Sequence, residues 1–250
     1  MNRPSALFVL ASALLVVACD ARPYASFGGV TVDGALRLNL TGIPKMAKVN
    51  VCDKDMESLA DVQVPIDCVA PDDMPLDYGK DIESKPIPIV VKPLVGSSKR
   101  FDKTLTLKSI DQRQILEGVL GAVTRGGKLG EAKKGGDKPG VAVMGYGGVR
   151  AFDAKTLSDV DVVVRVSLVN KRDAGRSCAY SGAVTGKLQA YDADLEAFDA
   201  HTGKSIAKTR LTNDHPACPS ESYAKTGETV GVTSRPPDSK IDQWIRSTVK

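Results

Sequence analysis

The stretch VDVVVRVSLV, residues 160–169, decides the fold of this chain. β-branched side chains fill most of its positions, and they favour strands because their restricted χ1 angles suit a pleated surface. A run that stays apolar with so few interruptions is typical of a strand buried on both faces. We therefore predict a central strand of a sheet over Val160–Val169.

Other stretches on both sides alternate between apolar and polar residues, as half-buried strands do. The predicted strands are Ala35–Thr41, Lys48–Cys52, Val62–Ile66, Ile87–Val91, Val141–Met144 and two long strands between Ala183 and Leu211 that are joined at Asp199–Gly203. Gly203 suits that turn because glycine accepts a positive φ. Residues 71–85 and 125–140 are predicted to be an acidic loop and a basic loop.

Two segments have the period of a helix. Ser109–Gln112 fits a capping box, and an apolar stripe follows at i, i+3, i+4 and i+7 before Gly126 and Gly127 end the helix. A short closing helix is predicted near the C-terminus, with Ser239 as its cap. Its apolar side carries Ile241, Trp244, Ile245 and Val249. The predicted fold class is α+β, a mixed or largely antiparallel sheet with one main covering helix and two disulfides.

Composition excludes several classes of protein. Of 250 residues, 42% are hydrophobic and 26% charged, which is ordinary globular usage and excludes wholesale disorder. The formal net charge of +4 is too small for a nucleic-acid specialist, and a single sustained apolar run excludes a multi-span membrane protein. We therefore expect no nucleic-acid partner.

That apolar run lies at the N-terminus. Arg3 supplies a short basic region, and residues 6–18 are apolar except for Ser12. A membrane span needs about 20 apolar residues, so this shorter run is predicted to be the core of a signal peptide. The segment Leu15–Cys19 resembles the lipobox of bacterial lipoproteins.

The lipobox resemblance implies a definite chemistry. The signal peptide would be cleaved between Ala18 and Cys19, and the Cys19 sulfur would carry a diacylglycerol, with a further acyl group on its amine. Two or more chains anchor a protein stably, where one is marginal. The resemblance implies a bacterial cell membrane location on the periplasmic face, and it leaves inner and outer membrane open. The alternative is an ordinary secretory signal with Cys19 near the cleavage site by chance.

Cysteine counting supports export. The chain has five cysteines, and assigning Cys19 to lipid leaves an even number for an oxidising compartment. Of the three possible pairings we favour the one that keeps each pair within one half of the chain. The predicted disulfides are Cys52–Cys68 and Cys178–Cys218. A zinc site is disfavoured, because there is no Cys-x-x-Cys and only two histidines, His201 and His215, are available.

Motifs for catalysis fail on inspection. Arg150 stands where the third glycine of a dinucleotide loop beginning at Gly145 belongs, and Leu129 stands where a phosphate loop needs Ser or Thr. Ser205 and Ser222 begin Ser-x-x-Lys motifs, but no Ser-Asp-Asn completes that site. No catalytic or metal-binding residue is therefore predicted, and no cofactor is expected beyond the lipid on Cys19.

A cluster of carboxylates is the remaining candidate site. Asp192, Asp194 and Glu196 are predicted to share one strand face, with Asp199 following in the turn. Calcium binding is the alternative for such a face, but the spacing is not that of an EF-hand. We favour a solvated acidic surface.

The second hairpin carries a family resemblance. Asp199, Thr202, Gly203 and Lys204 form an Asp-x-x-Thr-Gly-Lys turn after a β-branched strand. Residues 87–212 are in this respect similar to the periplasmic α/β domains of penicillin-binding-protein activator lipoproteins and the curli-secretion channel family. This resemblance implies a role in protein–protein contact or envelope assembly rather than catalysis.

These observations predict a membrane-anchored, non-enzymatic docking or envelope-assembly module with an envelope protein as partner. Two alternatives stay open: an envelope hydrolase with a site built from scattered residues, and a carrier for a small ligand. The predicted divisions are a signal peptide (1–18), a lipid-anchored tether (19–30), a disulfide-bearing β region (31–95), an α/β domain (96–214), and coil with a short helix (215–250).

Overall fold

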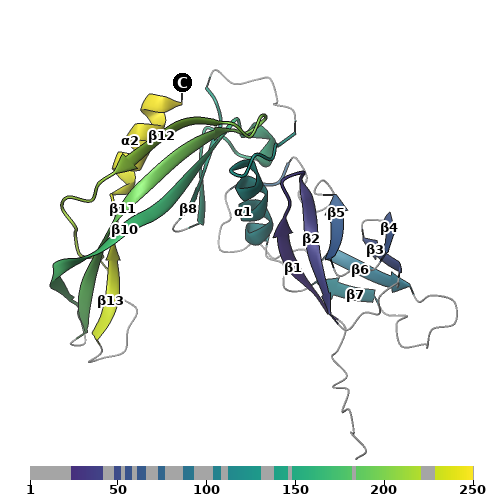
Figure 1. Ribbon diagram of the computed structural model, residues 1–250, viewed down its shortest axis with the longest axis horizontal. Coiled ribbons are helices and arrows are strands. Elements are labelled where there is room, and N and C mark those ends of the chain that lie inside the picture. Colours follow the sequence, from purple (N-terminus) through teal and green to yellow (C-terminus); the bar gives the residue numbers. More distant parts are fainter. Residues whose placement is uncertain are drawn as a thin grey trace, which may run out of the picture.

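The computed structural model gives an α+β fold that is mostly sheet (Figure 1). It describes residues 24–41, 48–51, 54–57, 61–65, 73–76, 87–92, 104–107, 112–130, 138–145, 148–181, 184–220 and 229–249. Within these ranges the strands form three sheets, and there are two α-helices.

Two small antiparallel sheets come from the first part of the chain. The first has the order β1-β2-β5, with β1 (Tyr24–Val30), β2 (Ala35–Thr41) and β5 (Asp61–Pro65). The second has the order β4-β3-β6-β7, with β3 (Lys48–Val51), β4 (Lys54–Glu57), β6 (Ile87–Lys92) and β7 (Thr104–Leu107). β7 therefore belongs with the preceding β region and not with the predicted 96–214 domain.

The large sheet is mixed and has the order β12-β11-β10-β8-β9. Its members are β8 (Val141–Gly145), β9 (Gly148–Phe152), β10 (Val162–Ala179), β11 (Thr185–Asp199), β12 (Ser205–Leu211) and β13 (Thr229–Ser234). β10 pairs with β8 in parallel, β13 pairs in parallel with the first part of β11, and the other pairs are antiparallel. The glycine-rich segment after Val141 is the β8–β9 hairpin, not a nucleotide loop.

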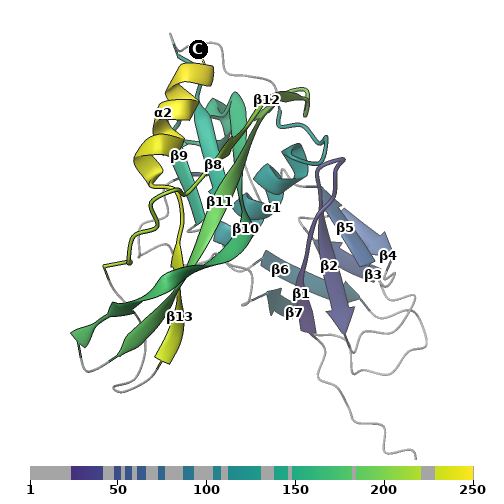
Figure 2. The same cartoon turned by 60° about the vertical axis from the view of Figure 1, so that its left-hand side comes forward.

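The two helices cover opposite faces of this sheet (Figures 1 and 2). α1 (Gln112–Val123) lies between the large sheet and β1–β2, and its Leu116 and Leu120 share a core with Val163. α2 (Asp238–Thr248) packs its Ile241 and Ile245 on the other face, where Val162, Val164 and Val166 point. β10 is thus buried on both faces where it begins, which confirms the prediction of a central strand.

A glycine sets the distance between α1 and β1. A Cβ at Gly118 would lie 2.8 Å from Cγ2 of Val30 and 3.0 Å from Cζ of Phe27. Any larger residue would push the helix away from β1. The core that α1 shares with the large sheet thereby extends to Val30, Leu36 and Leu38 of the first small sheet.

β10 and β11 continue beyond the helices and, with β13, form a projecting three-stranded ribbon (Figures 1 and 2). Its core is small and consists of Cys178, Leu188 and Val232. The prediction that the central strand ends at Val169 is wrong by ten residues. The register of β10 shifts twice in this part, and Asn170 and Gly175 have positive φ, so the alternation that marks a strand is broken there.

Other boundaries also differ from the sequence-based prediction. Residues 24–30, assigned to the tether, form β1, and the stretch assigned to coil contains β13. One main covering helix was predicted, but α2 covers the second face of the sheet. The N-cap of α2 is Pro237, because Ser239 already lies inside the helix. The predicted cap of the first helix, Ser109, lies outside the described residues.

Candidate functional site

The side of the large sheet that faces α1 has a part that α1 does not cover. We name it the polar sheet face and define it by six residues: Arg165, Ser167, Asp194, Glu196, Lys208 and Arg210, which line a concavity of about 460 Å³. Strand register brings them together, since Arg165 pairs with Glu196, Ser167 with Asp194, and Lys208 and Arg210 lie opposite the same two carboxylates. Alternate residues of the same strands form the apolar core under α2.

The charges of this face are linked by ion pairs. Glu196 accepts a hydrogen bond from Arg165 at 2.8 Å and contacts Nζ of Lys208 at 2.6 Å. Arg210 donates a hydrogen bond to each carboxylate oxygen of Asp194, at 2.5 and 2.9 Å. The hydrogen bond from Arg210 holds the pKa of Asp194 below its ordinary value. Burial raises the pKa of Glu196, but the Lys208 and Ser205 hydrogen bonds outweigh it and the net shift is downward. Both carboxylates are therefore ionised at neutral pH.

The cations of this face are the more exposed partners. The exposed fractions of the side chains are 69% for Lys208, 52% for Arg210 and 41% for Arg165, against 15% for Glu196. Three cations face two carboxylates, so the charge presented to the surroundings is positive. The surface predicted here from the carboxylates was acidic, and that prediction is wrong because the cations come from neighbouring strands.

Asp192, two residues earlier on β11, is buried and serves the fold. Its carboxylate accepts hydrogen bonds from Asn170 Nδ2 at 3.0 Å, Arg172 Nη1 at 2.8 Å and the Asn213 backbone N–H at 3.0 Å. These donors, the Asn213 backbone first, hold its pKa far below the ordinary value. The carboxylate fastens the segment after β12 onto β10 and β11.

The carboxylates of β11 have cationic and amide groups as neighbours rather than further carboxylates. Among the described residues no group of three or more His, Cys, Asp or Glu side chains is placed to hold a metal ion. Asp192, Asp194 and Glu196 are instead bound by arginine, lysine and amide groups of the chain itself.

The Asp-x-x-Thr-Gly-Lys turn is held together by its own first residue. Oδ1 of Asp199 accepts from the backbone N–H groups of His201 and Thr202 and from the Thr202 hydroxyl, and Gly203 has φ +67°. His201 Nδ1 lies 2.7 Å from the Gly130 carbonyl oxygen, and its Nε2 lies 3.4 Å from Asp161. These contacts join the hairpin to the segment after α1, so the motif has a structural role.

Of the predicted site residues, Cys178 and Cys218 form the expected disulfide, with 5.7 Å between their Cα atoms. It links the end of β10 to the segment that follows β12. Ala18, Cys19, Cys52 and Cys68 lie outside the described residues, so lipidation and the second disulfide stay predictions. Neither helix in the described part of the chain is long and apolar enough to span a membrane.

Comparison of the chain with known proteins found no matching family model, no similar curated protein and no similar solved structure.

Proposed function

We propose that the chain is an exported, lipid-anchored docking protein whose polar sheet face binds an acidic surface of another protein of the cell envelope. The observation that carries this proposal is the exposure of Lys208, Arg210 and Arg165 on a concave sheet face that α1 leaves uncovered. Exposed cations above internally paired carboxylates attract an anionic partner and orient it.

The geometry favours a protein partner over catalysis. The face is built on three adjacent strands in fixed register, so its charges are rigidly spaced. Its carboxylates are ionised and hydrogen-bonded, whereas a general acid needs a raised pKa. The one histidine–carboxylate contact described, His201 with Asp161, belongs to the hairpin tie.

The anchor is supported by the sequence and by the cysteines. The disulfide between Cys178 and Cys218 suits the oxidising compartment to which a lipobox directs a protein. Mass analysis of the mature N-terminus tests the anchor separately. We expect the first residue to be Cys19 with a diacylglycerol on its sulfur. An unmodified Cys19, or cleavage at another bond, would refute the anchor.

Site-specific photo-crosslinking in the native envelope tests the docking face. A photoreactive residue replaces Ser167, on β10 at one side of the face, in the full lipidated chain, and Ser239, exposed on α2, is the matched control position. We expect one envelope protein to be cross-linked from position 167 and not from position 239. Its cross-linked peptide should be rich in Asp and Glu.

Two double variants that each remove two positive charges complete this experiment. Lys208→Gln with Arg210→Gln should abolish the cross-link, and Lys204→Gln with Lys240→Gln, which removes the same charge elsewhere, should leave it intact. Raising the salt concentration should weaken it, since exposed charges are screened. Cross-links to lipid or glycan only, equal cross-linking from both positions, or equal effects of the two pairs would refute the docking proposal.

A further inference from the structure

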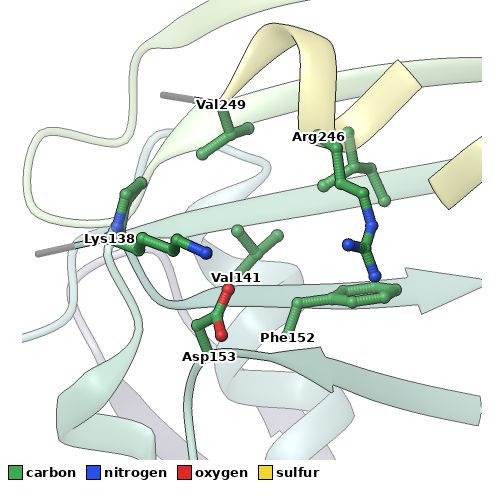
Figure 3. A pocket seen from close by; sticks show the side chains of 8 residues that line it. Lys138, Val141, Phe152, Asp153, Arg246 and Val249 are labelled. Atoms are coloured by element: carbon green, nitrogen blue, oxygen red, sulfur yellow. The ribbon is translucent and has the colours of Figure 1, made fainter. Parts of the chain in front are cut away.

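A second cavity lies on the other face of the large sheet, beside the C-terminal end of α2. It has a volume of about 430 Å³, and Figure 3 shows its side chains converging from three parts of the chain. These are Lys138, Pro139 and Val141 at the start of β8, Phe152 and Asp153 at the end of β9, and Ile245, Arg246 and Val249 of the C-terminal segment. The volume falls within the roughly 300–1,000 Å³ of pockets that hold small molecules.

The inner wall of this cavity is apolar. Val141 and Ile245 are 4% and 2% exposed, and the half-buried Phe152 and Val249 extend the same surface. The wall continues the core formed between α2 and the sheet. Burying an aliphatic or aromatic group against this wall is favourable, because the wall side chains have no polar atoms that would lose hydrogen bonds to water.

The rim of the cavity is charged and has an excess of positive charge. The charged side chains that line it are Lys138, Asp153 and Arg246, two positive and one negative. Arg246 extends toward Phe152 from the last turn of α2, and the ring of Phe152 also lies 5.9 Å from the guanidinium carbon of Arg150. The C-terminal end of a helix carries a partial negative charge of about one half. The full positive charge of Arg246 is larger, so the net charge at this end of α2 stays positive.

The nearby carboxylates of α2 are already paired with other arginines. Asp238 contacts Arg235 at 2.7 Å, and Arg150 lies 3.6 Å from Asp238 and 3.4 Å from Asp242. Within the described part of the chain no carboxylate forms an ion pair with Arg246. A ligand that brings its own anionic group therefore meets an accessible guanidinium next to an apolar wall.

We propose that this cavity binds a small carboxylate with an apolar body. The carboxylate lies against Arg246, and the apolar body lies against Val141, Phe152 and Ile245. A guanidinium suits this role, because its planar fork donates two parallel hydrogen bonds to one carboxylate. The site is on the opposite face of the sheet from the polar sheet face, so it goes beyond the docking function and stands independently of it.

Calorimetric titration of the mature chain with three probes of equal tail length tests the proposal. The probes are octanoate, octanol and octyltrimethylammonium, which share the tail and differ in head charge. We expect octanoate to bind at least about tenfold more tightly than octyltrimethylammonium, which corresponds to about 1.4 kcal/mol, with octanol between them.

Three variants locate the site. Arg246→Gln should weaken octanoate about tenfold and leave octanol unchanged, whereas Lys240→Gln, on the exposed side of the same helix, should change neither. Val249→Trp, which fills the mouth of the cavity, should weaken all three probes. Equal binding of octanoate and octyltrimethylammonium, binding that Arg246→Gln does not affect, or no octanoate binding in the millimolar range would overturn the proposal.

Discussion

Replacing Asp192 with Asn is expected to destabilise the protein by about 2–4 kcal/mol. The carboxylate accepts three hydrogen bonds while only 6% of the residue is exposed, and Arg172 gives it a charged partner at 2.8 Å. Hydrogen bonds to charged groups contribute about 1.5–3 kcal/mol each, and the ion pair with Arg172, which is 41% exposed, adds at most about 1 kcal/mol. Asparagine keeps one acceptor oxygen, so the expected loss lies below the sum of these contributions.

The effect should depend on pH with a definite sign. The pKa of Asp192 is lower in the folded protein than in the unfolded chain, so its contribution is complete above the unfolded pKa and is lost as the pH falls through the folded one. With an unfolded pKa of about 3.9, the difference between wild type and Asp192→Asn should shrink by about 1 kcal/mol between pH 7 and pH 3.

Urea unfolding of the mature chain at both pH values measures this difference. Asp194→Asn is the matched control, because its carboxylate is 40% exposed and an exposed ion pair contributes at most about 1 kcal/mol. Equal losses for the two variants at pH 7, or a difference that grows as the pH falls, would show that the buried carboxylate does not hold this part of the fold together.

Three further predictions concern the packing of the elements. The disulfide closes a loop of 40 residues and contributes up to about 4 kcal/mol to stability. The double variant Cys178→Ala with Cys218→Ala should therefore speed amide exchange in β13, which shares a core with Cys178, while α2 stays protected. Equally fast exchange in β13 and α2 would refute a local role of the disulfide. Gly118→Ala should lower the melting temperature because its Cβ meets Val30, whereas Gly121→Ala, 3.3 Å from the flexible Arg125, should keep or raise it; the reverse order would contradict the packing of α1 on β1. Arg150→Ala should cost about 1 kcal/mol in urea unfolding, because it removes the ion pairs of Arg150 with Asp238 and Asp242. A loss that high salt does not reduce would argue against these ion pairs.

The sequence pattern predicted correctly the strands in which apolar and polar residues alternate without interruption. Ala35–Thr41 was predicted with the bounds that β2 has, since its leucines alternate without a break. β1 was missed because residues 19–30 were assigned to a tether, and two glycines interrupt the strand pattern there. Gly28 and Gly29 belong to a β-bulge: the register shifts between Phe27 and Gly29, Gly29 has φ +109°, and a Cβ at Gly28 would lie 2.9 Å from Oδ1 of Asn39.

The two candidate sites could not be predicted, because they depend on which strands and helices lie next to each other, and local sequence patterns do not reveal this. The carboxylates of β11 were visible, but Arg165 lies 31 residues before Glu196 and Arg210 lies 16 residues after Asp194. Only strand order and register bring these cations onto the same face. The cavity beside α2 likewise needs the knowledge of which face α2 covers, since Arg246 on its own is an ordinary basic residue in a last helical turn.

Asp192 and Asp194 are two residues apart on one strand face, and what covers each of them decides its role. The segment after β12 buries the carboxylate of Asp192, and the Asn213 backbone N–H and Asn170 hold it there together with Arg172, whose side chain is 41% exposed. Nothing among the described residues covers Asp194 in this way, and its partner Arg210 is half exposed and available to a second anion. High salt should therefore weaken docking at the polar sheet face more than it weakens the contribution of Asp192 to stability, because two of the three donors to Asp192 are uncharged. If salt affected both equally, burial would not be what separates the structural carboxylate from the docking surface.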